Sequence, residues 1–358
     1  MFIRLITASL VIFSSLFITS PLLAAVSSAL DESTVAVEDR SRTLRSKALK
    51  TALQDVILKN SGSEAALSHP VILESLKNPS SLTTQFGYQE ADGELLLNVS
   101  FDHSKIIALL RQAQLPVWGK QRPTTLFWLA QSDMTDRMII SDSSDSELRQ
   151  VFNDFTQARA IPSVFPLMDL DDSMNISVND VRGLFVEPVA LASARYQPDY
   201  FVLASIDTVN EQTRYAFSLY QTQTDDALLT PLVSKRAEVT SADDAAAQIL
   251  SAVSEYYAGR YAIADSGEAN TTNIRFVDIA NRKQLVDIEK YLLQLSAVSA
   301  VRLVSLNGLS VEYQLNLFGT EEDLHRLMKL ESRIDELPQL ELELDQQSLS
   351  VPEYIWQG

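Results

Sequence analysis

Hydrophobic residues in the first part of the chain recur first with strand spacing and then with helical spacing. VAVED is a short strand, and it leads into a helix whose apolar face consists of Leu44, Ala48, Leu49, Leu53 and Val56. Two further strands, TTQFGYQE and ELLLNVSF, flank Asp92-Gly93, a dipeptide typical of two-residue hairpins. A last helix follows Asp102, which can cap it. The pattern predicts a small βαββα domain over residues 33–118.

A longer block, residues 123–262, alternates apolar strands with amphipathic helices. TTLFWLA is an unbroken apolar strand, which suits a sheet covered on both faces. Ser144 and Glu147 can form a capping box at the start of a helix, and VFPLMDL is expected to be a second buried strand. Helices and the strands DYFVLASI, RYAFSLYQ and LVSKRAEVT follow, before a long closing helix. This order predicts a central α/β domain with a mixed sheet and helices on both sides.

The polar segment DSGEANTTN, Asp265 to Asn273, has no periodicity and is expected to be a linker. Behind it, residues 273–358 show a strand, a helix, a hairpin at Asn307-Gly308, a second helix and a last strand, LELEL. This is the βαββαβ order of ferredoxin-like domains. The chain is therefore predicted to be multidomain and of mixed α+β and α/β class. The first and third blocks share the strand–helix–hairpin–helix order. Either this is an internal repeat, or the same common unit occurs twice without shared origin.

The connection LPVWGKQRPTTLFWLA predicts a joint between the first two domains. A helix should end before Pro116, because a residue that precedes proline is disfavoured in helical geometry. Gly119 and Pro123 then carry the chain through a tight turn. Trp118 is expected to wedge into the joint and Trp128 to lie in the next core, because buried aromatic residues usually serve packing. The alternative is that the tryptophans form an aromatic platform for a ligand.

The N-terminus has the parts of a secretory signal peptide. Arg4 supplies a positive charge, an apolar run follows, and small residues lie around Ala24 to Ala29. We expect residues 1–25 to form the signal peptide, with cleavage between Ala24 and Ala29, and the mature protein to be periplasmic. An uncleaved anchor helix is the alternative, since the apolar run is nearly long enough to span a bilayer. No cysteine follows this run, which excludes a lipoprotein anchor.

Composition narrows the possible functions. The chain of 358 residues has no cysteine, which excludes thiol catalysis and thiolate metal sites. Its net charge is −18, and without Arg4 the mature chain has 28 − 47 = −19. Such a charge repels phosphate backbones and anionic lipid surfaces, so we expect no nucleic-acid partner. No second long apolar segment follows the signal region, so no stable membrane insertion is expected after cleavage.

One acidic cluster, DLDDSMN, could bind a ligand. Asp169, Asp171 and Asp172 follow the second predicted strand of the central domain, and ligands often bind at such strand ends. Hard cations prefer oxygen ligands, but Met174 stands where a calcium loop requires glycine. The alternative is a solvated loop whose acidic residues cap the next helix. Arg195 could meet these carboxylates, either in a structural ion pair or as part of an anion site.

Sequence motifs for catalysis are missing. The chain has no nucleophile elbow, no Walker loop and no dinucleotide fingerprint. Its three histidines are scattered over two blocks and do not have metal-ligand or triad spacing. We therefore expect a protein that is not an enzyme and that has no cofactor.

Three segments resemble a known family. LPVWGKQRPTTLFWLA, FPLMDLDD and RGLFVEPVALASARYQPDY are similar to bacterial envelope proteins catalogued as domain of unknown function 2066. The likeness runs from about Val35 to Tyr261 and leaves the third block largely uncovered. The family has no established activity, so the resemblance implies only a Gram-negative envelope setting. In element order alone, the middle block also resembles the amino-terminal α/β domain of TolB.

Two functions of different class remain. The first is an exported, periplasmic, non-enzymatic interaction or assembly protein whose partner is another envelope protein. The second is a small-ligand or cation-binding protein, or a cryptic hydrolase, that uses the acidic loop of the central domain. The sequence does not indicate the oligomeric state.

Overall fold

The structure is a computed structural model that describes residues 30–91, 93–133, 136–210, 212–222, 229–338 and 351–358. The predicted signal peptide, residues 1–25, lies outside the described residues. Within the described parts, strands form three separate sheets with helices packed on them, so the mixed, multidomain class is confirmed. None of the helices in these parts is long and apolar enough to cross a membrane.

The first unit has the predicted βαββα order. Its strands are β1 (Glu32–Val37), β2 (Thr83–Ala91) and β3 (Glu94–Phe101), and its helices are α1 (Arg42–Ser61), α2 (Pro70–Ser75) and α3 (His103–Gln112), with short 3-10 turns η1 (Glu64–Ser68) and η2 (Pro79–Ser81). The sheet order is β1-β3-β2, and both pairings are antiparallel. The apolar side of α1 packs on this sheet and buries Leu53 and Val56 completely.

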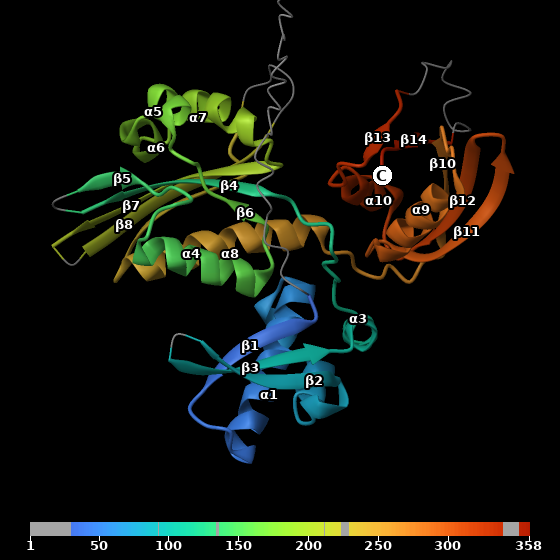
Figure 1. Cartoon of the computed structure of the whole chain (residues 1–358), viewed down its shortest axis with the longest axis horizontal. Helices are drawn as coiled ribbons and strands as arrows, with labels where there is room; N and C mark the ends of the chain where they lie inside the picture. Colours follow the sequence, from blue (N-terminus) through green and yellow to red (C-terminus); the bar gives the residue numbers. More distant parts are fainter. Residues whose placement is uncertain (1–29, 92, 134–135, 211, 223–228, 339–350) are drawn as a thin grey trace, which may run out of the picture.

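The middle unit contains a mixed sheet. Its strands are β4 (Thr125–Ser132), β5 (Arg137–Ile139), β6 (Ser163–Val164), β7 (Tyr200–Val209), β8 (Gln212–Gln221) and β9 (Val233–Val239). Its helices are α4 (Glu147–Arg159), α5 (Leu170–Asn175), α6 (Val178–Arg182), α7 (Val186–Ser193), the 3-10 turn η3 (Ala194–Tyr196) and α8 (Ala242–Tyr261). The sheet order is β5-β4-β7-β8-β9, with β6 beside β4, and β4 runs parallel to β7. Helices α4 and α8 cover one face and α5 to α7 the other (Figure 1), as the unbroken apolar strand β4 predicts.

Two local predictions in this unit were wrong. Of VFPLMDL only Val164 lies in a strand, β6, because Pro166 has no N–H to donate and Met168 adopts a positive φ of 52°. Ser146, not Ser144, caps α4, and its hydroxyl accepts a hydrogen bond from the Arg149 N–H at 3.2 Å.

The described part of the third unit contains two short strands near its end that were not predicted. Its elements are β10 (Asn270–Val277), α9 (Arg282–Gln294), β11 (Val298–Asn307), β12 (Ser310–Leu317), α10 (Glu321–Met328), β13 (Ile334–Glu336) and β14 (Glu353–Trp356), in the sheet order β11-β12-β10-β14-β13. β10 begins at Asn270, so the end of the predicted linker belongs to a strand. The predicted strand LELEL lies outside the described residues.

The last strand also departs from the ferredoxin-like arrangement, in which it runs antiparallel to the first. β14 pairs in parallel with β10, and β13, which follows α10, pairs antiparallel with β14 at the edge. The C-terminal strand therefore lies between β10 and the strand that follows α10. The first and third units still share a topology, since the orders β1-β3-β2 and β10-β12-β11 correspond.

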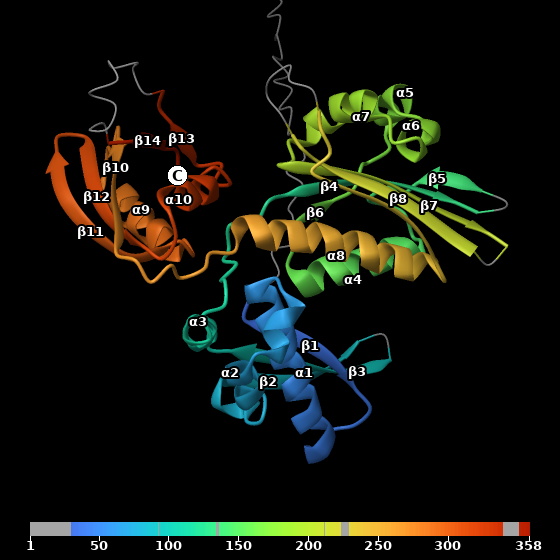
Figure 2. The same cartoon turned by 180° about the vertical axis from the view of Figure 1, so that it is seen from behind.

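The three units meet around α8. Figures 1 and 2 both show the first unit below α4 and α8, and the third unit beyond the C-terminal end of α8. The connections between units are also paired, since Val117 and Ile263 exchange backbone hydrogen bonds of 2.9 Å in each direction.

Candidate functional site

The structure brings the acidic cluster and Arg195 together. Asp169 is the N-cap of α5, and one of its oxygens accepts from the Asp172 N–H at 3.1 Å. The Arg195 guanidinium donates from Nη1 and Nη2 to the two Asp169 oxygens, each at 2.8 Å, and from Nη1 to Asp172 Oδ1 at 3.0 Å. This two-point contact is the strong form of an arginine-carboxylate pair.

Asp172 is the buried member of this network, with 1% of its surface exposed. Its Oδ2 accepts from the Met168 N–H at 2.9 Å and from the Tyr196 hydroxyl at 2.5 Å. The alternative of a solvated loop is therefore wrong for Asp172, because α5 turns this side chain inward, onto Tyr196. Asp171 is exposed beside the network.

These contacts make the cluster an internal ion pair. Hydrogen bonds from Arg195 lower the pKa of Asp169 to about 2, and the same bonds raise the pKa of Arg195. Each oxygen of Asp169 and Asp172 already accepts a hydrogen bond, so a cation would have to displace Arg195. Across the described residues, no group of three or more His, Asp or Glu side chains has the placement needed to hold a metal ion.

The predicted joint is built on Trp118 and on Arg122, a residue that the sequence motifs do not single out. The Trp118 ring is buried, and the Arg122 guanidinium lies over it at 3.9 Å from the ring centroid. Pro116 is exposed in the segment that follows α3, and Pro123 is buried shortly before β4. Gly119 accepts a hydrogen bond at its carbonyl from Arg122 Nε at 2.9 Å.

Arg122 joins the first unit to the middle unit through backbone carbonyls. Its Nη2 donates to the Lys59 carbonyl at 2.5 Å, and its Nη1 donates to the Arg159 carbonyl at 2.9 Å. These carbonyls belong to the last turns of α1 and α4, where a helix carries partial negative charge and favours a cation. Burial lowers the pKa of Arg122 to about 9, which leaves it charged at neutral pH.

Trp128 is also a packing residue. Its side chain is completely buried, and the indole N–H donates to the Ser193 hydroxyl at 2.9 Å. The Tyr196 ring meets it edge-on at 6.3 Å between centroids. Since both tryptophans are buried, neither forms an exposed platform for a ligand.

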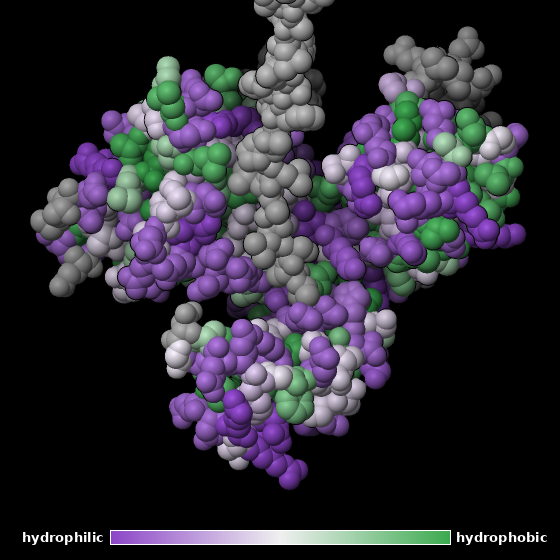
Figure 3. All heavy atoms as spheres, in the orientation of Figure 1, coloured by the Kyte–Doolittle hydropathy of each residue, from purple (hydrophilic) through white to green (hydrophobic). Residues whose placement is uncertain are grey.

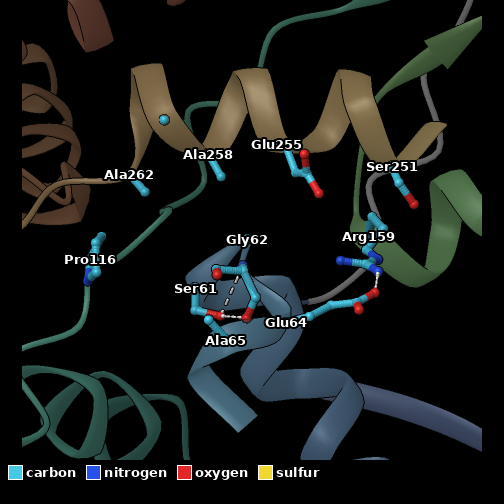
Figure 4. Close-up of a pocket in the computed structure, with 12 residues that line it drawn as sticks. Ser61, Gly62, Glu64, Ala65, Pro116, Arg159, Ser251, Glu255, Ala258 and Ala262 are labelled. Atoms are coloured by element: carbon cyan, nitrogen blue, oxygen red, sulfur yellow. Dashed lines mark hydrogen bonds and ion pairs between the residues drawn. The ribbon is translucent and has the colours of Figure 1, made fainter. Parts of the chain in front are cut away.

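A cavity of about 440 Å³ lies between the end of α1 and α8. Figure 4 shows Gly62 and Ala65 on one side, and on the other Ala258 of α8 and Ala262, which directly follows α8. The ion pair between Arg159 and Glu64, 2.6 Å long, closes one end of it. The charged groups that could contact a ligand here are thus partly engaged, and small side chains line most of the cavity.

A surface that no sequence motif indicates lies along β11. We call it the β11 surface and define it by Leu303, Val304 and Leu306 with Leu309 of the following turn. β11 is an edge strand, yet Leu303 and Leu306 are 53% and 57% exposed. They stand opposite the buried Tyr313 and Val311 of β12, at the rim of the face that α9 covers. Figure 3 shows hydrophobic residues along this outer edge of the third unit.

Two family models match separate parts of this chain. A family model described as a domain of unknown function, DUF8605, matches residues 24–119, and the model DUF2066 matches residues 270–351. The third unit thus matches DUF2066. The resemblance to this family is confirmed, but its extent was wrong, because the matched residues lie in the block that the quoted segments leave uncovered. The likeness to TolB is not confirmed.

Other comparisons add little. No curated protein matches the chain. Among solved structures, the C-terminal domain of LpoB from Salmonella enterica matches with 12% identity, over 33% of this chain and 83% of that chain, at a TM-score of 0.22. A TM-score this low indicates neither a shared fold nor a shared function.

Proposed function

We propose that this protein is a non-enzymatic interaction protein of the bacterial periplasm, and that it binds another envelope protein through the β11 surface. The observation that carries the proposal is the exposure of large apolar side chains on an edge strand. Soluble proteins usually protect such strands, because their free backbone groups and apolar side chains pair with other chains.

The chemistry of β11 favours an extended segment of a different protein as its occupant. Such a segment would add a strand to the sheet and place apolar side chains beside Leu303 and Leu306. Arg302 is the single charged residue of β11, so an acidic residue opposite it would complete the pairing.

A second copy of this chain fits the β11 surface less well. Antiparallel pairing of β11 with itself, centred on Arg302, would place two Arg302 side chains directly opposite one another, and like charges across strands are destabilising. The mature chains, each with a charge near −19, would also repel one another.

The alternative function, ligand or cation binding at the acidic loop, has weaker support. Asp169 and Asp172 are held by Arg195 and Tyr196. Calorimetric titration of the mature protein with calcium and magnesium tests it, and measurable binding that disappears in Asp169→Asn would favour that function.

The periplasmic location rests on the N-terminal signal features. N-terminal sequencing of protein from a periplasmic extract should recover a chain that begins between Ala25 and Leu30. Recovery of Met1 from a membrane fraction would contradict the periplasmic location. The binding surface has its own test, which follows.

Site-specific photocrosslinking in intact cells tests the binding surface. A photoreactive amino acid is placed at Leu303 or Leu306, with Leu73 of the first unit as control because its exposure, 49%, is close to theirs. We expect a discrete product from the two β11 positions whose crosslinked peptides map to one segment of one partner. Arg302→Glu should remove that product, and Arg302→Lys should retain it.

Three outcomes would contradict the proposal. They are equal products from Leu73 and Leu303, a product with twice the mass of this chain, and insensitivity to Arg302→Glu. Equal products would indicate non-specific contact, and a product of twice the mass would indicate binding of another copy of this chain. Insensitivity to Arg302→Glu would indicate a partner that does not interact with the charge on β11.

A further inference from the structure

A second cavity lies between the first and third units, about 350 Å³ in volume. Its walls come from α3, from the joint that follows it, from the chain between the end of α9 and the start of β11, and from Phe318 after β12. This volume is within the range of small-molecule sites, roughly 300–1,000 Å³. The cavity is separate from the β11 surface and from the acidic loop.

The lining of this cavity is basic in a strongly acidic chain. His103, Arg111 and Lys120 line it, and among its described lining residues there is no carboxylate. Asp31 and Asp102 act on His103, and Asp265 acts on Arg111, all from outside the lining. In a chain whose net charge is −18, this local excess of positive charge favours an anion.

Apolar side chains form most of the remaining wall, and two polar groups there have no hydrogen-bond partner in the described structure. Ile107, Leu293, Val298 and Phe318 line the cavity, and the Arg111 guanidinium lies 4.1 Å from the centroid of the Phe318 ring. Arg111 donates to the carbonyls of Ile263 and Ser296, yet its Nε is buried and has no hydrogen-bond partner within the described structure. The Ser296 hydroxyl, also in the lining, is buried and equally unpartnered there. Buried donors of this kind are costly unless a ligand or water satisfies them.

We propose that this cavity binds a small organic anion that consists of a carboxylate on a short apolar body. Lys120, at the exposed side, and the free donors of Arg111 and Ser296 hold the carboxylate, while Leu293 and Phe318 contact the apolar body. Burial lowers the pKa of Arg111 to about 10, so it remains a cation at neutral pH.

Calorimetric titration of the mature protein at pH 7.5 with butanoate, hexanoate and octanoate tests the proposal. Burial of each methylene should tighten binding about fourfold until the cavity is full, since a buried methylene contributes about 0.8 kcal/mol. Octanamide, which has the same body without the charge, should bind at least about tenfold more weakly than octanoate. N-acetyl-leucine presents the same chemistry as a peptide C-terminus, and its affinity relative to hexanoate distinguishes a peptide end from a free acid as the source.

A matched pair of lysine variants distinguishes binding inside the cavity from attraction of the anion to any nearby positive charge. Lys120 lines the cavity, whereas Lys105 is exposed on the same helix as His103 and lies outside the lining. Lys120→Gln should weaken octanoate binding about fivefold or more, and Lys105→Gln should leave it unchanged. Leu293→Ser, at a side chain that is already more than half exposed, should weaken octanoate more than butanoate.

The proposal is overturned if octanoate does not bind, if affinity is independent of chain length, or if octanamide binds as well as octanoate. Equal losses in Lys120→Gln and Lys105→Gln would also overturn it, because they would reflect the overall charge alone. A chain that carries Leu306→Glu should bind octanoate as the parent does, so failure of the partner surface and failure of this cavity are distinguishable.

Discussion

The first unit meets each of its two neighbours at a joint where an arginine donates to backbone carbonyls. We call a joint closed where every nitrogen of that arginine has a hydrogen-bond partner, and only one of the two joints is closed. At the joint with the middle unit, Nε, Nη1 and Nη2 of Arg122 all donate, and its guanidinium stacks on Trp118. At the joint with the third unit, Nη1 and Nη2 of Arg111 donate to Ile263 and Ser296, whereas Nε has no partner in the described structure.

This difference separates structural from functional roles. A fully satisfied buried cation fixes the relative position of α1 and α4, because any movement leaves helix-end carbonyls without donors. A partly satisfied cation beside a cavity leaves hydrogen-bonding capacity for something else. The acidic loop resembles the fully satisfied joint, since Arg195 and Tyr196 donate hydrogen bonds to its carboxylates.

The largest effect is expected from Arg122→Met, which keeps an apolar stem like that of arginine but removes the guanidinium donors. Helix-end carbonyls, including those of Lys59 and Arg159, would be buried without partners. We expect the free energy of unfolding to fall by roughly 3–5 kcal/mol, measured by urea titration with tryptophan fluorescence. Arg122→Lys, which retains a charge and fewer donors, should lie between this variant and the parent. A loss below about 1 kcal/mol in Arg122→Met would show that the joint is not closed by this residue.

A smaller loss is expected from Gly62→Ala at the same joint. Gly62 has a φ of +69°, and a Cβ there would lie 2.5 Å from Ala258 Cβ on α8. The left-handed conformation and the overlap together should cost roughly 2–4 kcal/mol in the same urea titration. Gly308→Ala is the matched control, because Gly308 has a φ of +61° and no atom within 4 Å of its added Cβ. If both variants lose the same amount, close packing of α1 against α8 does not stabilise the joint.

The sequence predicts this joint only in part. Pro116, Trp118, Gly119 and Pro123 are visible as a turn with a buried aromatic residue, because these residue types restrict the chain locally. Arg122 is not distinguished by its neighbours, since its role depends on carbonyls that are 63 and 37 residues away in the chain. Long-range contacts of this kind leave no local pattern.

The same limit explains the results for the fold and the candidate sites. Elements with clear periodicity, such as α1, β4 and the hairpin of β11 and β12, were predicted, because burial on one face sets their spacing. VFPLMDL was predicted wrongly, because its apolar composition hides the effect of Pro166. The meeting of Asp169 with Arg195 was an open alternative, and the burial of Asp172 could not be foreseen because it depends on Tyr196.

At the open joint, Arg111→Met should have a milder effect than Arg122→Met. Two hydrogen bonds to the carbonyls of Ile263 and Ser296 would be lost, but these lie beside a cavity that water can enter. We expect a loss of about 1–2 kcal/mol in the urea titration. Limited proteolysis should then cut faster in the segment between α8 and β10. A loss as large as that in Arg122→Met would remove the distinction between the two joints.

The smallest effect concerns the pH dependence of the open joint. Burial lowers the pKa of His103 below its usual value of 6.5, with Lys120 acting in the same direction and Asp31 and Asp102 opposing it. Above this usual value the folded and unfolded chains both carry a neutral His103, so the residue has no effect on stability.

As the pH falls below about 6.5, the unfolded chain binds the proton first and the folded chain loses stability. The free energy of unfolding of the parent should therefore fall more steeply between pH 7.5 and 5 than that of His103→Gln. Arg122→Met should keep the slope of the parent, because neither arginine nor methionine gains or loses a proton in this range. A parent and a His103→Gln variant with parallel pH profiles would show that His103 is as accessible to protons in the folded protein as in the unfolded chain.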